Sequence, residues 1–140
     1  EAARDGKTFA VAIIDIDFFK PVNDEYGHQA GDFILREFTK IVGSMLRPYD
    51  LLGRYGGEEF IVISMNSSKE QTSLILERIL DAVRGSTFPW EGKNLRITFS
   101  CGVADSLSCC GGSLLAETII RNADERLYAA KREGRNRVLC

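Results

Sequence analysis

FAVAIIDID, residues 9–17, is the stretch of the sequence that says most about the architecture. Its first six residues form an unbroken apolar run, which is typical of a strand buried on both faces and predicts a central strand of a sheet. Asp15 and Asp17 follow at once, and because side chains alternate along a strand, both carboxylates can leave the strand end on the same side. This placement suits a metal site. An isolated Asp-x-Asp is nevertheless weak evidence, because one carboxylate can cap a turn while the other is solvated.

A second pair of acids strengthens the metal interpretation. Residues 50–55 and 58–65 flank Gly56-Gly57, which can adopt positive φ, so the segment predicts a β-hairpin with its turn at these glycines. Glu58-Glu59 stands just past the turn, either as a charged hairpin tip in which adjacent acids repel each other, or as a source of hard oxygen ligands from a second sheet segment. The second interpretation suits Mg²⁺, which usually binds carboxylates together with water and substrate phosphates.

Hydrophobic periodicity predicts three amphipathic helices and two further strands around this hairpin. In chain order we expect a helix over 27–46 ended by Pro48, a capping box at Ser67 to Glu70 that opens a helix to about Gly85, a half-buried strand over 95–104, a loop over 108–112, a helix from a Ser113 cap to Gly134, and an edge strand over 136–140. The order β-α-β-β-α-β-α-β predicts an α/β fold, an α+β sandwich of split-βαβ type with a mostly antiparallel central sheet flanked by helices.

Composition limits the classes of protein to which the chain can belong. Its 140 residues, 44% of them hydrophobic, predict one compact domain over residues 1–140 with a full core. A formal net charge of -2 gives no general positive field, so we expect no nucleic acid and no membrane contact, and any phosphate site must be local. The four cysteines lack metal-ligand spacing, which favours reduced thiols and a cytoplasmic location. Because the chain opens with Glu1, we expect a piece of a larger protein.

Basic side chains for a local phosphate site are present but scattered. Lys20 follows the acidic strand end, and Lys131 and Arg135 bracket Gly134 at the end of a predicted helix. Cations at a helix C-terminus are favoured by the helix dipole whether or not they bind a ligand. Neither a GxxxxGK phosphate loop nor a GxGxxG turn occurs, which excludes P-loop and Rossmann nucleotide sites at the level of motifs.

Four blocks of the sequence carry a resemblance to a known family. Residues 15–32 read DIDFFKPVNDEYGHQAGD, residues 54–60 read RYGGEEF, and two further blocks lie at 99–104 and 123–136. In this order they strongly resemble the blocks of the GGDEF family, the diguanylate cyclases, with the signature turn in its GGEEF form. Residues 1–8 do not match the DxLTxLxNR segment with which the family usually opens. The resemblance implies a ferredoxin-like, nucleotide-cyclase palm-like fold and an enzyme that condenses two GTP into cyclic di-GMP with loss of two pyrophosphates.

The resemblance also implies roles for the acidic residues. Asp15, the carbonyl of Ile16 and Glu58 would hold Mg²⁺, or Mn²⁺ in its place, against the triphosphate, and the metal charge would support attack of a 3′-hydroxyl on the α-phosphate. Glu59 is a candidate general base by position, although metal activation can make a base unnecessary. Asp17 would be either a further ligand or a support for the loop.

Nucleotide contacts follow from the same resemblance. The phosphates would be cradled by the backbone amides of Phe18 and Phe19 and by the charges of Lys20, Lys131 and Arg135. Asn23 and Asp32 match the guanine-reading positions. A carboxylate suits guanine because the base presents N1–H and N2–H₂ as paired donors, whereas adenine would face it with an acceptor.

A product-binding motif is implied as well. Arg47 and Asp50 form an RxxD that stands five residues before Gly56, which is the family's spacing for the inhibitory site that binds cyclic di-GMP. The guanidinium of Arg47 is suited to forked contacts with phosphate or with a guanine edge. A plain Arg–Asp surface pair is the alternative, and such a pair contributes little.

The resemblance implies one GTP per subunit of a homodimer, and a regulatory domain upstream in the full-length protein. The main alternative is a non-catalytic regulatory module that binds GTP or cyclic di-GMP. Such domains usually carry a broken signature turn, and residues 56–60 are intact. A phosphatase of the haloacid dehalogenase type would need a small Gly-Thr-like stretch after Asp-x-Asp, which Phe18-Phe19-Lys20 does not supply.

Overall fold

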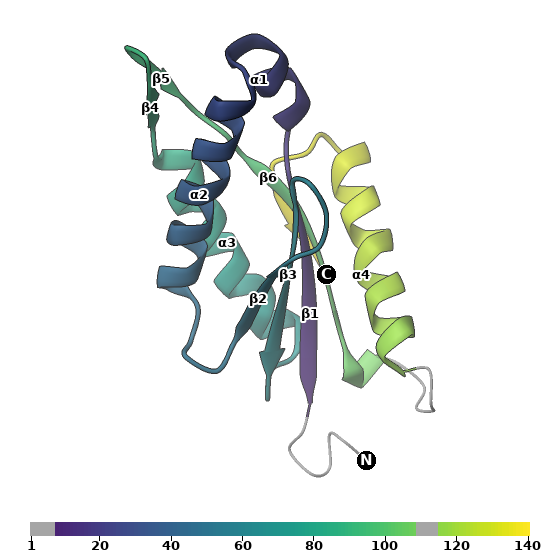
Figure 1. Cartoon of the computed structure of the whole chain (residues 1–140). Helices are drawn as coiled ribbons and strands as arrows, with labels where there is room; N and C mark the ends of the chain where they lie inside the picture. The colour runs from purple at the N-terminus through teal and green to yellow at the C-terminus, as the bar shows by residue number, and fades with distance from the viewer. Residues whose placement is uncertain (1–7, 109–114) are drawn as a thin grey trace.

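The computed structural model describes residues 8–108 and 115–140, which form two β-sheets and several helices (Figure 1). In chain order the elements are β1 (Phe9–Ile16), α1 (Phe19–Tyr26), α2 (His28–Met45), β2 (Leu51–Arg54), β3 (Glu59–Met65), α3 (Lys69–Gly85), β4 (Phe88–Trp90), β5 (Lys93–Leu95), β6 (Phe99–Asp105), the 3₁₀-helix η1 (Ser106–Ser108), α4 (Leu115–Arg132) and β7 (Arg137–Leu139).

β1 lies at the centre of the large sheet, whose strand order is β2-β3-β1-β6-β7. It pairs antiparallel with β3 and β6, and β2 pairs antiparallel with β3, whereas β7 runs parallel to β6 at the edge. The predicted central strand, hairpin, edge strand and mostly antiparallel sheet are therefore confirmed. The expected reason for the hairpin turn is wrong, because neither Gly56 nor Gly57 has a positive φ.

Helices cover both faces of this sheet, as the predicted sandwich requires (Figure 1). Side chains of β1 alternate between the two layers: Ala12 and Ile14 pack in the core with α2 and α3, whereas Ile13 packs with α4. At Gly102 of β6, a side chain would lie 2.1 Å from the carbonyl oxygen of Ala123. Glycine therefore lets the backbone of α4 approach the strand directly.

The prediction of one half-buried strand over 95–104 is wrong in two respects. Leu95 ends the short β4–β5 hairpin, which the sequence did not predict, and β6 begins only at Phe99. Every residue of β6 is buried. The small residues Gly102 and Ala104 alternate with apolar ones along this strand, but they lie beneath α4 and do not face water. Both faces of the strand are covered for this reason.

The start of α3 differs from the prediction by one residue. Ser68, not Ser67, is the N-cap: its hydroxyl accepts a hydrogen bond from the backbone N–H of Gln71 at 3.1 Å, and the Gln71 side chain accepts one from the Ser68 N–H at 2.9 Å. Ser67 instead accepts a hydrogen bond from Arg47. The capping box exists, but the neighbouring serine forms it.

α1 is an element that the sequence analysis missed. Pro21 lies in its first turn, where a missing N–H costs no helical hydrogen bond, and α2 begins directly after Gly27. The expected loop over 108–112 lies, apart from Ser108, outside the described residues, and so does Ser113. Among the helices that the structure describes, none is both long and apolar enough to cross a membrane.

Candidate functional site

The end of β1 and the β2–β3 turn form the floor of a charged cavity. Asp15 is paired across the sheet with Glu59, and the backbone N–H of Ile16 donates a hydrogen bond to the carbonyl of Glu58 at 3.2 Å. A cavity of about 220 Å³ is lined by Asp15, Ile16 and Glu58, the three predicted metal ligands. The fold thus brings together the end of a strand and a hairpin turn that the sequence separates by more than forty positions.

The cations of this cavity come from the far end of the chain. Lys131, in the last turn of α4, donates a hydrogen bond from its ammonium group to the carboxylate of Asp15. Arg135 lines the same cavity, and its guanidinium lies 5.0 Å from the ring centroid of Phe18. Figure 1 shows the end of α4 and the end of β1 at the same end of the sheet. The predicted phosphate-binding cations therefore lie beside the predicted metal ligands.

The donor set is suited to a hard divalent ion. Two carboxylates and one backbone carbonyl offer oxygen ligands, and Mg²⁺ usually takes only one or two carboxylates and completes its shell with water and phosphate oxygens. Within residues 8–108 and 115–140, no three His, Cys, Asp or Glu side chains group closely enough to hold an ion by themselves. The ammonium of Lys131 on Asp15 shows that the position attracts a cation. Metal binding here would depend on phosphate oxygens as well as on the protein.

Glu59 is the cross-strand partner of Asp15, so the two side chains leave the same face of the sheet, although the cavity wall that the described residues form does not include Glu59. Burial raises the pKa of its carboxyl group, and the negative charges of Asp15, Glu58 and Asp124 raise it further, against the opposing charge of Lys131. A raised pKa is a property that a general base can use near neutral pH. The role of Glu59 as a base stays a prediction.

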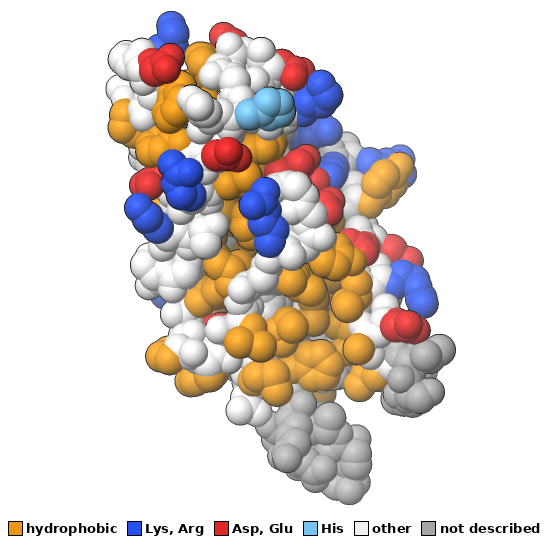
Figure 2. All heavy atoms as spheres, viewed as in Figure 1, with side chains coloured by type: hydrophobic (Ala, Val, Ile, Leu, Met, Phe, Trp, Pro, Cys, Tyr) orange, Lys and Arg blue, Asp and Glu red, His pale blue; other side chains and the backbone are white. Residues whose placement is uncertain are grey.

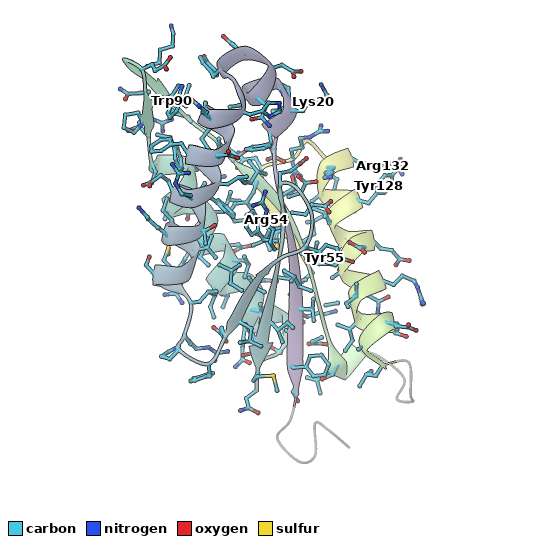
Figure 3. All side chains as sticks on the ribbon, in the orientation of Figure 1. Lys20, Arg54, Tyr55, Trp90, Tyr128 and Arg132 are labelled. Carbon is cyan, nitrogen blue, oxygen red and sulfur yellow. The ribbon has the colours of Figure 1, made fainter. Side chains whose placement is uncertain are left out.

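The loop after β1 forms the cavity's third side. Phe18 precedes α1 with a left-handed backbone, at φ 58°, and its ring is exposed. The backbones of Phe18 and Phe19 thus open a helix, where N–H groups are free to meet an anion. Lys20 also lines the cavity, and its ammonium pairs with Asp24 at 2.9 Å (Figure 3).

A second cavity, of about 630 Å³, adjoins the first and shares Phe19, Lys20 and Glu58 with it. It is lined by both predicted guanine readers, Asn23 and Asp32. Figure 2 shows charged side chains around the chain's only histidine on this part of the face, whereas the lower part is mostly apolar. One nucleotide could therefore place its phosphates in the smaller cavity and its base in the larger one.

Gly31 of α2 shapes the base side of this cavity. A Cβ atom at Gly31 would lie 1.9 Å from Oδ1 of Asn23, so only glycine leaves room for this carboxamide. That oxygen is buried and has no hydrogen-bond partner among the described residues. The Asn23 side chain would therefore have to rotate before this oxygen could accept a hydrogen bond from a base in the cavity.

Arg54 is a residue that the sequence reasoning quoted but did not single out. Its guanidinium donates hydrogen bonds to the carbonyls of Gly56 and Gly57, at 3.2 Å and 2.5 Å for the closest contacts, and it lines the base-side cavity (Figure 3). It thereby holds the signature turn that carries Glu58. The available signal was its position, two residues before the glycine pair.

The RxxD motif lies at the other end of the hairpin. The carboxylate of Asp50 is fully buried and accepts hydrogen bonds from Nε and Nη2 of Arg47, the closest at 2.9 Å, and from the Arg47 backbone N–H at 3.0 Å. Nη2 also reaches Ser67 Oγ at 2.7 Å. Burial raises the pKa of Asp50, but the hydrogen bonds and charge of Arg47 outweigh it and hold this pKa below its usual value.

A cavity with carboxylates on one wall and cations on the other, next to a larger cavity, has the chemistry expected of a site for a metal-complexed nucleotide. The family model for "Diguanylate cyclase, GGDEF domain" matches residues 1–137, and the chain belongs to this family.

Named relatives agree with this assignment. Diguanylate cyclase A of Treponema denticola is 43% identical over 132 residues, which cover 94% of this chain and 35% of that protein. The response regulator PleD of Caulobacter vibrioides is 41% identical over 140 residues, which cover 99% of this chain and 30% of that protein. The chain thus spans about a third of the length of these curated relatives.

A solved structure supports the fold over nearly the whole chain. The active GGEEF domain of a diguanylate cyclase from Vibrio cholerae superposes with a TM-score of 0.87 at 34% identity, covering 99% of this chain and 86% of that one. The GGDEF domain of DgcB from Caulobacter crescentus, solved in complex with c-di-GMP, gives a TM-score of 0.88 at 36% identity and covers 98% and 80%.

Proposed function

We propose that this domain is a diguanylate cyclase that condenses two GTP into cyclic di-GMP with loss of two pyrophosphates. The observation that carries the proposal is the pair of adjoining cavities. Asp15, Ile16, Glu58 and Lys131 line the smaller cavity, and the larger cavity beside it has room for a base. Relatives that are named diguanylate cyclases support it.

Diguanylate cyclases need a divalent metal, for which we propose Mg²⁺ with Mn²⁺ as a substitute. Asp15, the carbonyl of Ile16 and Glu58 would hold it, and it would supply positive charge at the α-phosphate and at the attacking 3′-hydroxyl. Lys131 and Arg135 would balance the charge of the phosphates, together with the backbone N–H groups of Phe18 and Phe19. Glu59 is proposed as the base that accepts the hydroxyl proton, with its raised pKa as support.

Asp32 and Asn23 are proposed to select guanine. Asp32 lines the larger cavity and is exposed, so its carboxylate is accessible to accept hydrogen bonds. Guanine would satisfy it with two donors, whereas adenine would leave a desolvated charge beside an acceptor.

The reaction requires a second copy of the domain. The adjoining cavities have room for one nucleotide, with one phosphate end and one base end, so the second GTP is proposed to come from a partner subunit whose cavity faces this one. A regulatory domain upstream in the full-length protein would control whether the two subunits bring their cavities face to face.

The decisive experiment is an incubation of the domain with GTP and Mg²⁺ at several protein concentrations, with products identified by chromatography. We expect cyclic di-GMP and pyrophosphate, and a specific activity that rises with protein concentration because two subunits must meet. A rate strictly proportional to protein, or release of phosphate without a dinucleotide, would contradict the proposal. Tight binding of GTP or cyclic di-GMP without turnover would instead identify a non-catalytic regulatory module.

Feedback inhibition is a further part of the proposal. Arg47 and Asp50 stand at the foot of the hairpin whose turn carries Glu58, and the exposed edge of the Arg47 guanidinium could receive the phosphate of cyclic di-GMP. A ligand held there could restrain the hairpin or link two domains in an unproductive arrangement.

A further inference from the structure

We propose that Asp17 is a positioning residue, whose buried carboxylate holds the turn of residues 134–136 against the end of β1 and so fixes Arg135 at the phosphate cavity. This inference rests on the proposed function in one respect, that the cavity takes a polyphosphate. The sequence leaves two roles open for Asp17, a metal ligand or a support for the loop. Its contacts favour the second.

Both oxygens of the Asp17 carboxylate already accept hydrogen bonds. Oδ1 accepts one from Ser100 Oγ at 2.7 Å, and Oδ2 accepts two, from Thr98 Oγ1 at 2.6 Å and from the backbone N–H of Asn136 at 3.0 Å. A carboxylate offers about four lone-pair sites, so most of its capacity is used within the protein. The side chain is buried, which leaves little room for solvent to replace these partners.

These partners all lie on one side of β1. Thr98 and Ser100 belong to the β6 side, and the backbone N–H of Asp17 donates to the Thr98 carbonyl at 2.9 Å. Glu58 is on the opposite side, where its carbonyl accepts a hydrogen bond from Ile16. Asp17 contributes to the cavity wall, yet its carboxylate is bound toward β6 and β7 and away from the proposed metal ligand on the hairpin.

The turn that Asp17 holds has a rare backbone conformation. Gly134, Arg135 and Asn136 have φ angles of 118°, 64° and 55°, a region that non-glycine residues seldom adopt. Such a conformation persists where surrounding contacts impose it. Here Asn136 is held twice, by its backbone N–H on Asp17 and by its side-chain oxygen, which accepts from Arg84 at 2.7 Å.

Arg135 is the functional end of this arrangement. It stands between two residues of the held turn, and its guanidinium lies over the Phe18 ring at the cavity. If the Asp17 carboxylate is removed, the Asn136 N–H loses its acceptor and the turn its link to β1. Arg135 would then have to be ordered at the moment of binding, which weakens phosphate binding.

Two substitutions separate positioning from metal ligation. Asp17→Ala removes the side-chain hydrogen bonds to Thr98, Ser100 and Asn136. Asp17→Asn keeps the shape: its oxygen can accept from Thr98 and Asn136, and its NH₂ group can donate to the Ser100 hydroxyl, which is also an acceptor. A neutral amide is a poorer ligand for a hard divalent ion than a carboxylate, so a metal role predicts that Asp17→Asn fails as well.

The readout is calorimetric binding of a GTP analogue with a methylene bridge between the α- and β-phosphates, at varied Mg²⁺, to the 140-residue chain. We expect Asp17→Ala to weaken binding about tenfold or more, as Arg135→Ala does, and the double variant to be no weaker than Arg135→Ala alone. Asp17→Asn should stay within about threefold of the parent, with the same Mg²⁺ dependence. Asp105→Ala is the matched control, because this buried carboxylate also accepts a backbone N–H, at 2.6 Å from Lys69, but at the other end of β6.

A second readout needs no nucleotide. Hydrogen exchange of the Asn136 amide, followed by NMR, should be slow in the parent and in Asp17→Asn and much faster in Asp17→Ala. The proposal is overturned if Asp17→Asn binds the analogue as weakly as Asp17→Ala, if it requires more Mg²⁺, or if the Asn136 amide stays protected in Asp17→Ala. Should Asp17→Ala not fold, Asp17→Asn and its Mg²⁺ dependence decide alone. If the parent binds no analogue, the proposed function fails, whereas the exchange of Asn136 still decides the role of Asp17.

Discussion

Lys131 and Asp15 form an ion pair that joins the end of α4 to the end of β1 across 116 positions of sequence. The Asp15 carboxylate is buried, while the Lys131 side chain is about one third exposed. A divalent ion on Asp15 would therefore meet a site whose charge is already partly balanced, and Lys131 could turn to an incoming phosphate without leaving a buried charge unpaired. Substrate and metal binding are expected to be coupled for this reason.

Asp15→Asn and Glu58→Gln should each abolish turnover while the fold survives. Each removes a hard ligand at the cavity without emptying space in the core, so we expect melting temperatures within a few degrees of the parent. Cyclic di-GMP formation and thermal unfolding, measured on the same samples, check this. Global unfolding of both variants would assign these carboxylates a structural role instead.

Stability should depend on the ionisation of Asp50. Its pKa is lowered in the folded state, so its pair with Arg47 stabilises the fold above the unfolded pKa of about 4, and this contribution is lost as pH falls through the lower folded pKa. We expect the parent to be more stable than Asp50→Asn at pH 7, with the difference shrinking as the pH falls below about 4. Urea unfolding of both proteins at several pH values measures it, and a difference independent of pH would contradict the ionic explanation.

Local patterns predicted most of the architecture because they reflect local rules. The apolar run of β1 can be recognised from neighbouring residues alone. The hairpin turn does form at Gly56-Gly57, but without positive φ and with its carbonyls bound by the Arg54 side chain. The errors concern contacts between elements that lie far apart in the sequence. The sequence predicted a half-buried β6 because it does not reveal that α4 packs directly over Gly102. It predicted the wrong capping serine because it does not reveal that Ser67 accepts a hydrogen bond from Arg47, twenty residues away.

The sequence indicated which residues belong to the site but not which of their side chains are in contact. Four sequence blocks indicated Asp15, Glu58 and Lys131, but chain order cannot show which side chains meet. The partners of Asp17 lie 81, 83 and 119 positions away, so its role could be left open only between two alternatives. Steric effects such as the contact of Gly31 with Asn23 likewise require coordinates.

Asp32→Ala should erode the preference for GTP over ATP. Loss of a charged acceptor that pairs with guanine should lower the ratio of kcat/KM values by about 10- to 100-fold, or about 1.5–3 kcal/mol. Steady-state kinetics with both nucleotides measures the ratio. Glu37→Ala, which removes another carboxylate from α2 outside the cavities, should leave it unaltered. An unchanged ratio in Asp32→Ala would remove this residue from base recognition.

Gly31→Ala should raise the KM for GTP without unfolding the domain. The new methyl group would occupy the space of the Asn23 carboxamide, a flexible side chain that can rotate away and thereby leave the base-binding wall. We expect roughly a tenfold higher KM, equivalent to about 1.4 kcal/mol. Gly43→Ala is the matched control in the same helix, because its Cβ would meet nothing within 4 Å and alanine favours helix by about 1 kcal/mol. Equal KM values in both variants would contradict the steric explanation.

Arg47 should mediate inhibition by cyclic di-GMP at a site separate from GTP. Its guanidinium bonds to Asp50, Met65 and Ser67 use Nε and Nη2, and the Tyr49 ring lies 4.8 Å from it. The side chain is about one third exposed, which leaves part of the guanidinium accessible to a ligand. Inhibition of the parent should be noncompetitive with GTP, because the motif lies at the opposite end of the hairpin from Glu58. Arg47→Ala should abolish this inhibition, so that the rate of GTP turnover no longer falls when cyclic di-GMP is added.

This experiment needs a control because the partner of Arg47, Asp50, is buried. Arg47→Ala leaves the fully buried Asp50 carboxylate without its cation, which should cost on the order of 3 kcal/mol of unfolding free energy and could by itself disturb the hairpin. The double variant Arg47→Ala/Asp50→Ala removes the orphaned charge, so it should recover part of this stability and still resist inhibition. If cyclic di-GMP inhibits the double variant as strongly as the parent, or if calorimetry shows that product binds the parent only in competition with GTP, the inhibitory site lies elsewhere.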